Sequence, residues 1–252
     1  MDLGLTGKAA LITGATKGIG RAVAEALLDE GASVAICART GEDVDQAVKE
    51  LSARGTVVGS AVDVADSEQL RGWVADAAEQ LGAIDVYVHN TSGKPARDLA
   101  GWQKNFTVDL MALIHGVDAA TEHLADGDGG ALISVGTTAT AEHFATGSNS
   151  YSAFKSAVTN WTLGQAQVLG ARGVRCNVVS PGPVLIEGGD WDRIKQAMPP
   201  FYESTEKAHP GGRLGSAADV AAAVAFLASP RAGHVNGVNL TVDGGFLKRV
   251  DF

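Results

Sequence analysis

Short apolar runs alternate with longer amphipathic stretches from one end of the chain to the other. The first run is followed by Ile19, Val23, Ala26 and Leu27, which share one face of a helix. Strands that are apolar throughout and separated by helices are typical of a parallel sheet covered on both faces. We therefore expect strands at Ala9–Thr13, Ser33–Ala38, Val57–Val62, Ile84–His89, Ala131–Val135, Val174–Val179 and Val238–Val242.

This pattern predicts an α/β fold: a Rossmann-type, doubly wound sheet of about seven parallel strands, with helices on both faces. No linker, repeat or low-complexity block interrupts it, so residues 1–252 are expected to form a single domain. The one long segment that looks irregular runs from Pro181 to about Gly212. Such segments are usually functional in compact domains, so we expect a lid at about 183–212.

Composition narrows the function classes. The 252 residues are 45% hydrophobic and 19% charged, as in ordinary globular proteins, and the net charge of −9 argues against nucleic acid or an anionic membrane surface as partner. The start lacks signal-peptide features, and no apolar run is long enough to span a bilayer. Cys37 and Cys176 lie within predicted strands without metal-ligand spacing. We expect a cytoplasmic protein with buried thiols and no metal; a reactive thiol is the alternative.

A glycine-rich turn links the first strand to the first helix. Residues 13–20 read Thr-Gly-Ala-Thr-Lys-Gly-Ile-Gly, with the spacing Gly-x-x-x-Gly-x-Gly. Glycines let a pyrophosphate approach the backbone, and the helix N-terminus offers N–H groups and a favourable dipole. The alternative is a turn that binds nothing. The expected dinucleotide contacts in this turn are Gly14, Thr16, Lys17, Gly18, Ile19 and Gly20.

The end of the second strand indicates which dinucleotide is bound. Sites that prefer NAD place an acidic residue there, against the ribose 2′-hydroxyl. This chain has Arg39 at that place and no acid, and the fork of a guanidinium suits a 2′-phosphate. Lys17, in the glycine-rich turn, is expected to reach the same phosphate. We predict NADP(H) rather than NAD(H), with two solvated surface cations as the alternative.

Tyr151 and Lys155 are four residues apart, so on a helix they share one face. A free tyrosine has a pKa near ~10, and a cation held beside it favours the phenolate and lowers that pKa. Such a pair suits proton transfer with a carbonyl or an alcohol. Taken alone the pair is weak support, because amphipathic helices bring such residues together by chance.

With these motifs the chain resembles the short-chain dehydrogenase/reductase family over almost its whole length. Besides the glycine-rich turn and the Tyr-x-x-x-Lys pair, the resemblance rests on Asp63-Val64, on Asn90 in a variant of the Asn-Asn-Ala-Gly segment, and on the segments 177–182, 213–215, 226–229 and 242–245. It implies that hydride passes from the cofactor to a carbonyl carbon while Tyr151 protonates the oxygen. Lys155 would lower the pKa of Tyr151 and bind the nicotinamide ribose. Further cofactor contacts implied are Asp63, Val64, Asn90, Pro181, Gly182 and Val184.

Two positions depart from the family pattern. In the family the catalytic serine lies thirteen residues before the tyrosine, and this position is Thr138 here. Thr137 and Ser134 are rival hydroxyl donors, and a structural role at the strand end is the alternative for Thr138. The relay asparagine is replaced by Asp109. An ionised carboxylate accepts but does not donate hydrogen bonds, so Asp109 is expected either to pair with Lys155 or to be purely structural.

The sequence gives fewer indications of the residues that bind the substrate. His143 and Trp191 are candidates for the substrate pocket, although a structural role is the alternative for each, and His89 is expected to be packed. The aromatic residues of the lid, Trp191 to Tyr202, favour a small, partly apolar ketone or alcohol. Alternatives are a 3-oxoacyl thioester reductase of the fatty-acid or polyketide type, or a relative that senses the dinucleotide without turnover. The resemblance also implies a homo-oligomer, a tetramer or a dimer.

Overall fold

The computed structural model describes residues 2–126, 129–142 and 149–249. The seven predicted strands are all present, as β1 (Ala9–Thr13), β2 (Ser33–Ala38), β3 (Val57–Ala61), β4 (Val86–His89), β5 (Ala131–Val135), β6 (Arg175–Pro181) and β7 (Asn239–Val242). The largest differences from the predicted bounds are at β4, which begins two residues late, and at β6, which continues to Pro181 because its end pairs with Val242.

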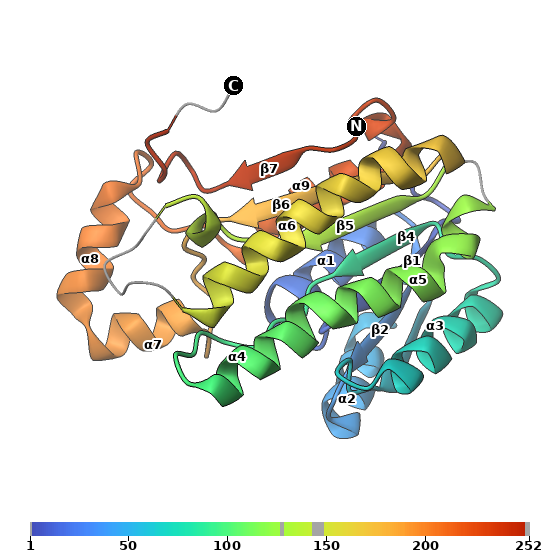
Figure 1. The fold of residues 1–252 in the computed structure, drawn as a ribbon, viewed down its shortest axis with the longest axis horizontal. Helices are drawn as coiled ribbons and strands as arrows, with labels where there is room; N and C mark the ends of the chain where they lie inside the picture. The colour runs from blue at the N-terminus through green and yellow to red at the C-terminus, as the bar shows by residue number, and fades with distance from the viewer. Residues whose placement is uncertain (1, 127–128, 143–148, 250–252) are drawn as a thin grey trace.

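The strands form one parallel sheet in the order β3-β2-β1-β4-β5-β6-β7. The chain winds outward from β1 to one edge, returns, and winds outward to the other edge, as predicted for a doubly wound sheet. All carboxyl ends of the strands therefore lie along one edge of the sheet. The arrowheads of β6 and β7 in Figure 1 point to that edge.

Helices cover both faces of the sheet. One face packs against α1 (Gly18–Asp29), α2 (Gly41–Leu51) and α9 (Ala217–Ala228), and the other against α3 (Ser67–Leu81), α5 (Ala112–Ala125) and α6 (Ser150–Leu169). Alternate residues of each strand enter the two cores: Ile12 and Val88 face the first, Leu11 and Tyr87 the second. The second group of helices lies in front of the sheet in Figure 1.

Helix α6 begins beside the carboxyl ends of the strands and carries the Tyr151/Lys155 pair in its first two turns. Its N-cap is Asn149, whose side chain accepts a hydrogen bond from the Ser152 backbone N–H at 3.0 Å. This cap satisfies one of the free N–H groups of the helix end and fixes where the first turn starts. The place of Tyr151 is thus set by local sequence.

The prediction that Pro181 to about Gly212 is irregular is wrong, because most of this segment is helical. It forms α7 (Asp190–Ala197) and α8 (Pro199–Ala208), at the left of Figure 1 beyond the ends of β6 and β7. Pro199 stands at the first position of α8, where a missing N–H costs nothing, so the prolines start a helix here. Gly188 and Gly212 bound the pair, each with φ of +65°.

A second run of helix precedes β5. The short α4 (Leu99–Asn105) continues through the π-helical turn η1 (Phe106–Met111) into α5. π-Helical turns are rare and occur often at functional sites. The buried residue of this turn is Asp109.

Both cysteines are buried, as expected: Cys37 lies within β2 and Cys176 within β6. Burial raises the pKa of each thiol to about 12. Over the described part of the chain, no helix is both long and apolar enough to cross a membrane.

Candidate active site

A cavity of about 580 Å³ opens at the carboxyl ends of the central strands. It is bounded by the segment after β4, the end of β5, the start of α6, the end of β6 and the lid helices. Strand ends converge at such an edge, so side chains distant in sequence meet there. The predicted residues that line it are Ile19, Asn90, Thr138, Tyr151, Lys155, Pro181, Gly182, Val184 and Trp191.

The glycine-rich turn lies beside this cavity, and its lack of side chains lets a ligand come close to the backbone. Gly14 and Gly18 have φ of +66° and +64°, a conformation that favours glycine. A Cβ on Gly20 would stand 2.4 Å from the Gly14 carbonyl oxygen, so no other residue fits there. Helix α1 starts after Lys17 with no side-chain cap. Its N–H groups are thus left for another acceptor, which fits the pyrophosphate of a dinucleotide.

The remaining predicted cofactor residues follow the neighbouring strands of the same edge. Arg39 comes directly after β2 and is exposed, as is Lys17 in the turn after β1. Asp63 and Val64 follow β3, and the Asp63 carboxylate accepts a hydrogen bond from the Ala65 backbone N–H at 3.0 Å. The order β3-β2-β1-β4 places these residues in a row that ends at the cavity.

Asn90 holds the glycine-rich turn in place. Its side-chain amide donates to the carbonyl oxygens of Thr13 and Gly14 at 3.1 and 3.0 Å, and its backbone N–H donates to the Thr13 hydroxyl at 3.0 Å. These bonds join the ends of β1 and β4.

Lys155 and Asp109 form a buried ion pair. Lys155 Nζ lies 3.4 Å from Asp109 Oδ1, and the two side chains are only 2% and 0% exposed. Lys155 also donates to the carbonyl oxygens of Val135 at 2.9 Å and Thr91 at 3.3 Å. Of the two roles expected for Asp109, the structure shows the pairing. The two carbonyl oxygens take two of the three N–H donors of the ammonium, and the contact with Asp109 Oδ1 is an ion pair.

Asn105 and Ser150 complete this buried network, and sequence reasoning missed both. Asp109 Oδ2 accepts from the Asn105 side-chain amide and from the Gly93 N–H, each at 2.9 Å. The Ser150 hydroxyl donates to Asn105 Oδ1 at 2.9 Å. Asn105 lies one helical turn before Asp109, so the four-residue spacing was the available signal.

His89 is packed, as expected. Its Nε2 lies 2.9 Å from the Asp109 carbonyl oxygen within the same buried region. Burial, and then the nearby Lys155 cation, hold the pKa of His89 well below its usual range, so the ring is neutral. A neutral ring adds no charge beside the ion pair.

The hydroxyl of Tyr151 faces the cavity, and its environment differs from expectation. Burial raises the pKa of Tyr151 to about 12; a hydrogen bond from Thr137 opposes this, and the carboxylates of Asp109 and Asp190 raise it further. The pKa is thus raised rather than lowered by its surroundings. The main physical reason is burial of the phenol, and the Lys155 cation, which is paired with Asp109 at 3.4 Å, does not offset it.

Of the three hydroxyl residues considered, Thr137 is the one whose side chain lowers the pKa of Tyr151, against the larger effect of burial. Both threonines line the cavity, and Thr138 begins the short 3₁₀ turn η2 (Thr138–Thr140), for which Thr137 is the N-cap. Ser134, the other rival, is turned into the core, where its hydroxyl is 2.8 Å from that of Thr162. Thr137 and Thr138 both line the cavity and are the two candidates for the donor, whereas Ser134 is not.

Helices α7 and α8 contribute an aromatic wall. Trp191 of α7 stacks on Phe201 of α8, with ring centroids 5.9 Å apart and planes inclined by 16°, and both line the cavity. His143 lies outside the described residues. Elsewhere in the described chain, no group of three or more His, Cys, Asp or Glu side chains is placed to hold a metal ion.

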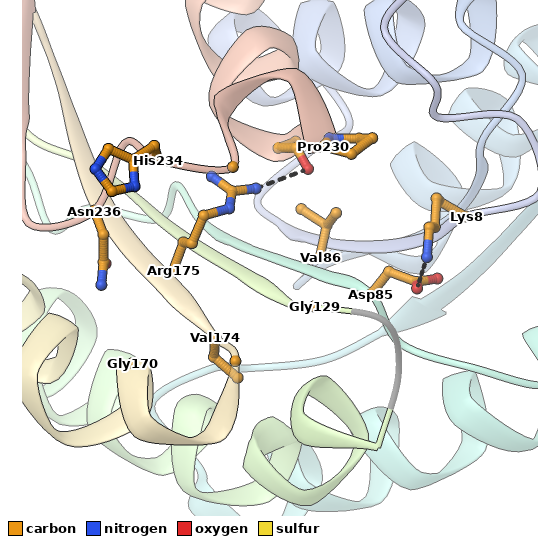
Figure 2. Close-up of a pocket in the computed structure, with 13 residues that line it drawn as sticks. Lys8, Asp85, Val86, Gly129, Gly170, Val174, Arg175, Pro230, His234 and Asn236 are labelled. Carbon is orange, nitrogen blue, oxygen red and sulfur yellow. Dashed lines mark hydrogen bonds and ion pairs between the residues drawn. The ribbon is translucent and has the colours of Figure 1, made fainter.

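A second hollow, of about 840 Å³, lies at the opposite, amino-terminal edge of the sheet (Figure 2). Its charged side chains have structural partners: Lys8 pairs with Asp85 at 2.8 Å, and Arg175 donates to the Leu227 carbonyl oxygen at 2.7 Å at the end of α9. It contains none of the predicted site residues. Although it is larger, we place the chemistry in the cavity beside Tyr151.

The fold and the residues gathered at its carboxyl edge define an oxidoreductase that uses a nicotinamide dinucleotide. A family model described as enoyl-(acyl carrier protein) reductase matches residues 14–247. The chain is similar to an isoepoxydon dehydrogenase of Penicillium expansum, 36% identical over 97% of this chain and 96% of that protein. This protein therefore belongs to the short-chain dehydrogenase/reductase family.

Two solved structures are similar over nearly the whole chain. An L-sorbose reductase from Gluconobacter frateurii, complexed with NADPH and L-sorbose, has a TM-score of 0.92 at 27% identity and covers 99% of this chain and 100% of its own. A 7α-hydroxysteroid dehydrogenase complexed with NADH and 7-oxo glycochenodeoxycholic acid has a TM-score of 0.89 at 27% identity and covers 99% and 98%. Oxidation and reduction of alcohols and carbonyls with a dinucleotide is common to these relatives.

Replacing Asp109 by Asn should destabilise the protein strongly at neutral pH, by about 3–5 kcal/mol, because it leaves the Lys155 cation buried without a partner. The pKa of Lys155 is already lowered by burial from its ordinary 10.5, with Asp109 opposing the shift. Without Asp109 it falls further. At pH values between the lowered pKa of Lys155 and 10.5, the unfolded variant binds more protons than the folded variant. The loss of stability relative to wild type should therefore shrink as pH rises.

Urea unfolding of wild type and variant between neutral pH and pH of about 10 measures this. Asp76→Asn, which removes an exposed carboxylate of α3, is the charge-matched control, and Lys155→Met in the Asp109→Asn background should recover most of the loss. Equal urea midpoints for Asp109→Asn and wild type at neutral pH would contradict the pairing.

Proposed function

We propose that the protein is an NADP(H)-dependent oxidoreductase that interconverts a ketone and a secondary alcohol on a small, partly apolar substrate, with Tyr151 as the acid and base. The observation that carries the proposal is the meeting of Tyr151, the Thr137 hydroxyl and the buried Lys155 in one cavity at the carboxyl edge of the sheet. When bound, the nicotinamide supplies or accepts the hydride.

Cofactor binding is assigned along the row of strand ends. The turn from Gly14 to Gly20 would hold the pyrophosphate, and Asp63 with Val64 the adenine side. Pro181, Gly182 and Val184 would flank the nicotinamide, since they line the cavity next to Tyr151. Arg39 and Lys17, both exposed, would bind a 2′-phosphate, which supports NADP(H).

Tyr151 would protonate the carbonyl oxygen during reduction. A pKa of about 12 keeps its hydroxyl protonated at neutral pH, so the proton is available to the substrate. Thr137 would donate a hydrogen bond to the same oxygen and orient it, with Thr138 as the alternative donor. Lys155, whose charge is balanced by Asp109, would hold the nicotinamide ribose rather than lower the pKa of Tyr151.

Two features support the lid and the substrate class. Trp191 and Phe201 present apolar surface to the cavity from α7 and α8, and Pro183, Val184 and Ile186 continue it. We assign α7 and α8 as the cover of the substrate. This pocket suits a ketone with an apolar body.

An acyl thioester carried on an acidic carrier protein is the less favoured substrate. Two arginines that could attract an acidic carrier already have partners within the chain. Arg172 forms a two-bond pair with Glu122 at 2.8–2.9 Å, and Arg175 binds carbonyl groups at the end of α9. With a net charge of −9, the chain has little to attract an acidic partner.

We infer further that the protein acts as a dimer or tetramer in the cytoplasm. Apolar side chains on the outer surface of η1 and α6 support association: Phe106 is 44% and Val168 62% exposed. The two unpaired, buried cysteines suit a reducing compartment.

Replacing Tyr151 by Phe should lower kcat for ketone reduction about 10²- to 10⁴-fold with little change in NADPH affinity, because only the transferable proton is lost. Reduction by wild type should vary little with pH near neutrality. Alcohol oxidation should speed up as pH rises toward the Tyr151 pKa of about 12, because the phenolate is the base. Steady oxidation of NADPH with a broad ketone panel measures both; a variant with wild-type rates would refute the assignment.

The two adjacent threonines offer a matched test. Thr137→Ala should lower kcat/KM about 10- to 100-fold, because it removes the hydroxyl that lowers the pKa of Tyr151, whereas Thr138→Ala should change it by less than about threefold. Thr137→Ser should retain activity. If Thr138→Ala is the more damaging change, the family spacing holds and the assignment of Thr137 is wrong.

Cofactor preference should depend on Arg39. Arg39→Ala is expected to raise KM for NADPH about 10- to 100-fold and to leave KM for NADH nearly unchanged, because only the 2′-phosphate contact is lost. Arg54→Ala, which removes an exposed arginine paired with Asp29 after α2, is the control and should change neither value. Tighter binding of NADH than of NADPH by wild type would contradict the proposal.

A further inference from the structure

Lys94 stands out in the wall of the substrate cavity. It is the one residue other than glycine, within the described ranges, that has a positive φ, of 41°. Side chains rarely adopt this conformation, and where a protein retains it the place is often a functional site. Glycine would adopt it without strain, so the lysine side chain is kept at a conformational cost.

The backbone on both sides of Lys94 is anchored to the buried network. On one side the Gly93 N–H donates to Asp109 Oδ2 at 2.9 Å, and a Cβ on Gly93 would meet the Asn105 amide at 3.0 Å. On the other side the Ser150 backbone N–H donates to the Ala96 carbonyl oxygen at 2.9 Å, and the Ala96 N–H donates to the Ser150 hydroxyl oxygen at 3.2 Å. Lys94 is therefore presented to the cavity from a fixed segment.

The charge of Lys94 is the one left uncompensated around the cavity. Of the other ionic side chains that line it, Lys155 is paired with Asp109, and Asp190 with Arg193 on the lid. Lys94 has neither a hydrogen bond from its ammonium nor an ion pair with any described residue. The other lining side chains are mostly apolar, so a single cation remains at the edge of an apolar pocket.

We propose that Lys94 binds a carboxylate of the substrate, so that the preferred substrate is an oxo acid or hydroxy acid with an apolar body. This rests on the proposed function, since it assigns the substrate class of the same site. A protein with a net charge of −9 repels anions in general, so selection for one requires a local cation such as this. One ammonium without a second donor group suits a carboxylate better than a phosphate, which usually takes several donors.

The test compares three acids with their primary amides, which are neutral and nearly isosteric: levulinate, 4-oxocyclohexanecarboxylate and 4-acetylbenzoate. For at least one pair, wild type should reduce the acid with kcat/KM about 10- to 100-fold above the amide. Lys94→Gln should abolish this preference by lowering kcat/KM for the acid while leaving the amide within about twofold. Lys94→Arg should keep most of it.

Two further variants separate the local charge from other effects. Lys94→Gly should also lose the preference, and it should fold at least as well as wild type because φ at this position favours glycine. Lys104→Gln, which removes an exposed lysine of α4 that does not line the cavity, makes the same change in net charge and should leave the preference intact.

The outcomes distinguish the two levels of the proposal. If neutral ketones are reduced but no acid is preferred, or if Lys94→Gln leaves the preference unchanged, Lys94 does not select a carboxylate although the oxidoreductase stands. If Lys94→Gln instead weakens NADPH binding and affects acid and amide equally, the cation serves the cofactor and the inference is overturned. If no ketone of any kind is reduced, the proposed function itself fails.

Discussion

The buried ion pair between Lys155 and Asp109 is the constraint on which the site depends. Two opposite charges 3.4 Å apart, almost without contact to solvent, are stable in the interior only while both are present and their other donors and acceptors are hydrogen-bonded. The carbonyl groups of Val135 and Thr91, the Gly93 N–H and the Asn105 amide satisfy them. The pair therefore joins β5, the segment after β4, the π-helical turn and α6 into one rigid assembly.

This arrangement changes what the lysine can contribute. A cation whose charge is matched by a carboxylate has little effect on the phenol four residues away, so burial dominates and the pKa of Tyr151 rises to about 12. The site thus suits a proton donor at neutral pH more than a base. Aspartate in place of the family's asparagine is then a difference in electrostatics as well as in hydrogen bonding.

Much of the fold could be predicted because its signals are local. Apolar runs specify buried strands, and the glycine-rich turn and the Tyr151/Lys155 spacing depend on contacts within a few residues. The effect of Thr137 on Tyr151 could not be predicted, because which of two adjacent threonines acts on the phenol depends on how the 3₁₀ turn leaves β5. The backbone conformation of Lys94 is imposed by anchors at Asp109 and Ser150, which are distant in sequence. The segment from Pro181 to about Gly212 was predicted to be irregular, whereas α7 and α8 make up most of it and Pro199 begins α8.

Helices α7 and α8 form a part of the cavity wall that is separate from the buried network. Helices α7 and α8 are bounded by Gly188 and Gly212, which take the left-handed conformation, and they are held together by their own Trp191–Phe201 stack. They add apolar wall to the cavity without supplying any member of the Lys155–Asp109 network. The segment between the two glycines is therefore a separable part of the wall: exchanging it between relatives would replace apolar surface of the cavity and Asp190, which acts on Tyr151, and would leave the Lys155–Asp109 network intact.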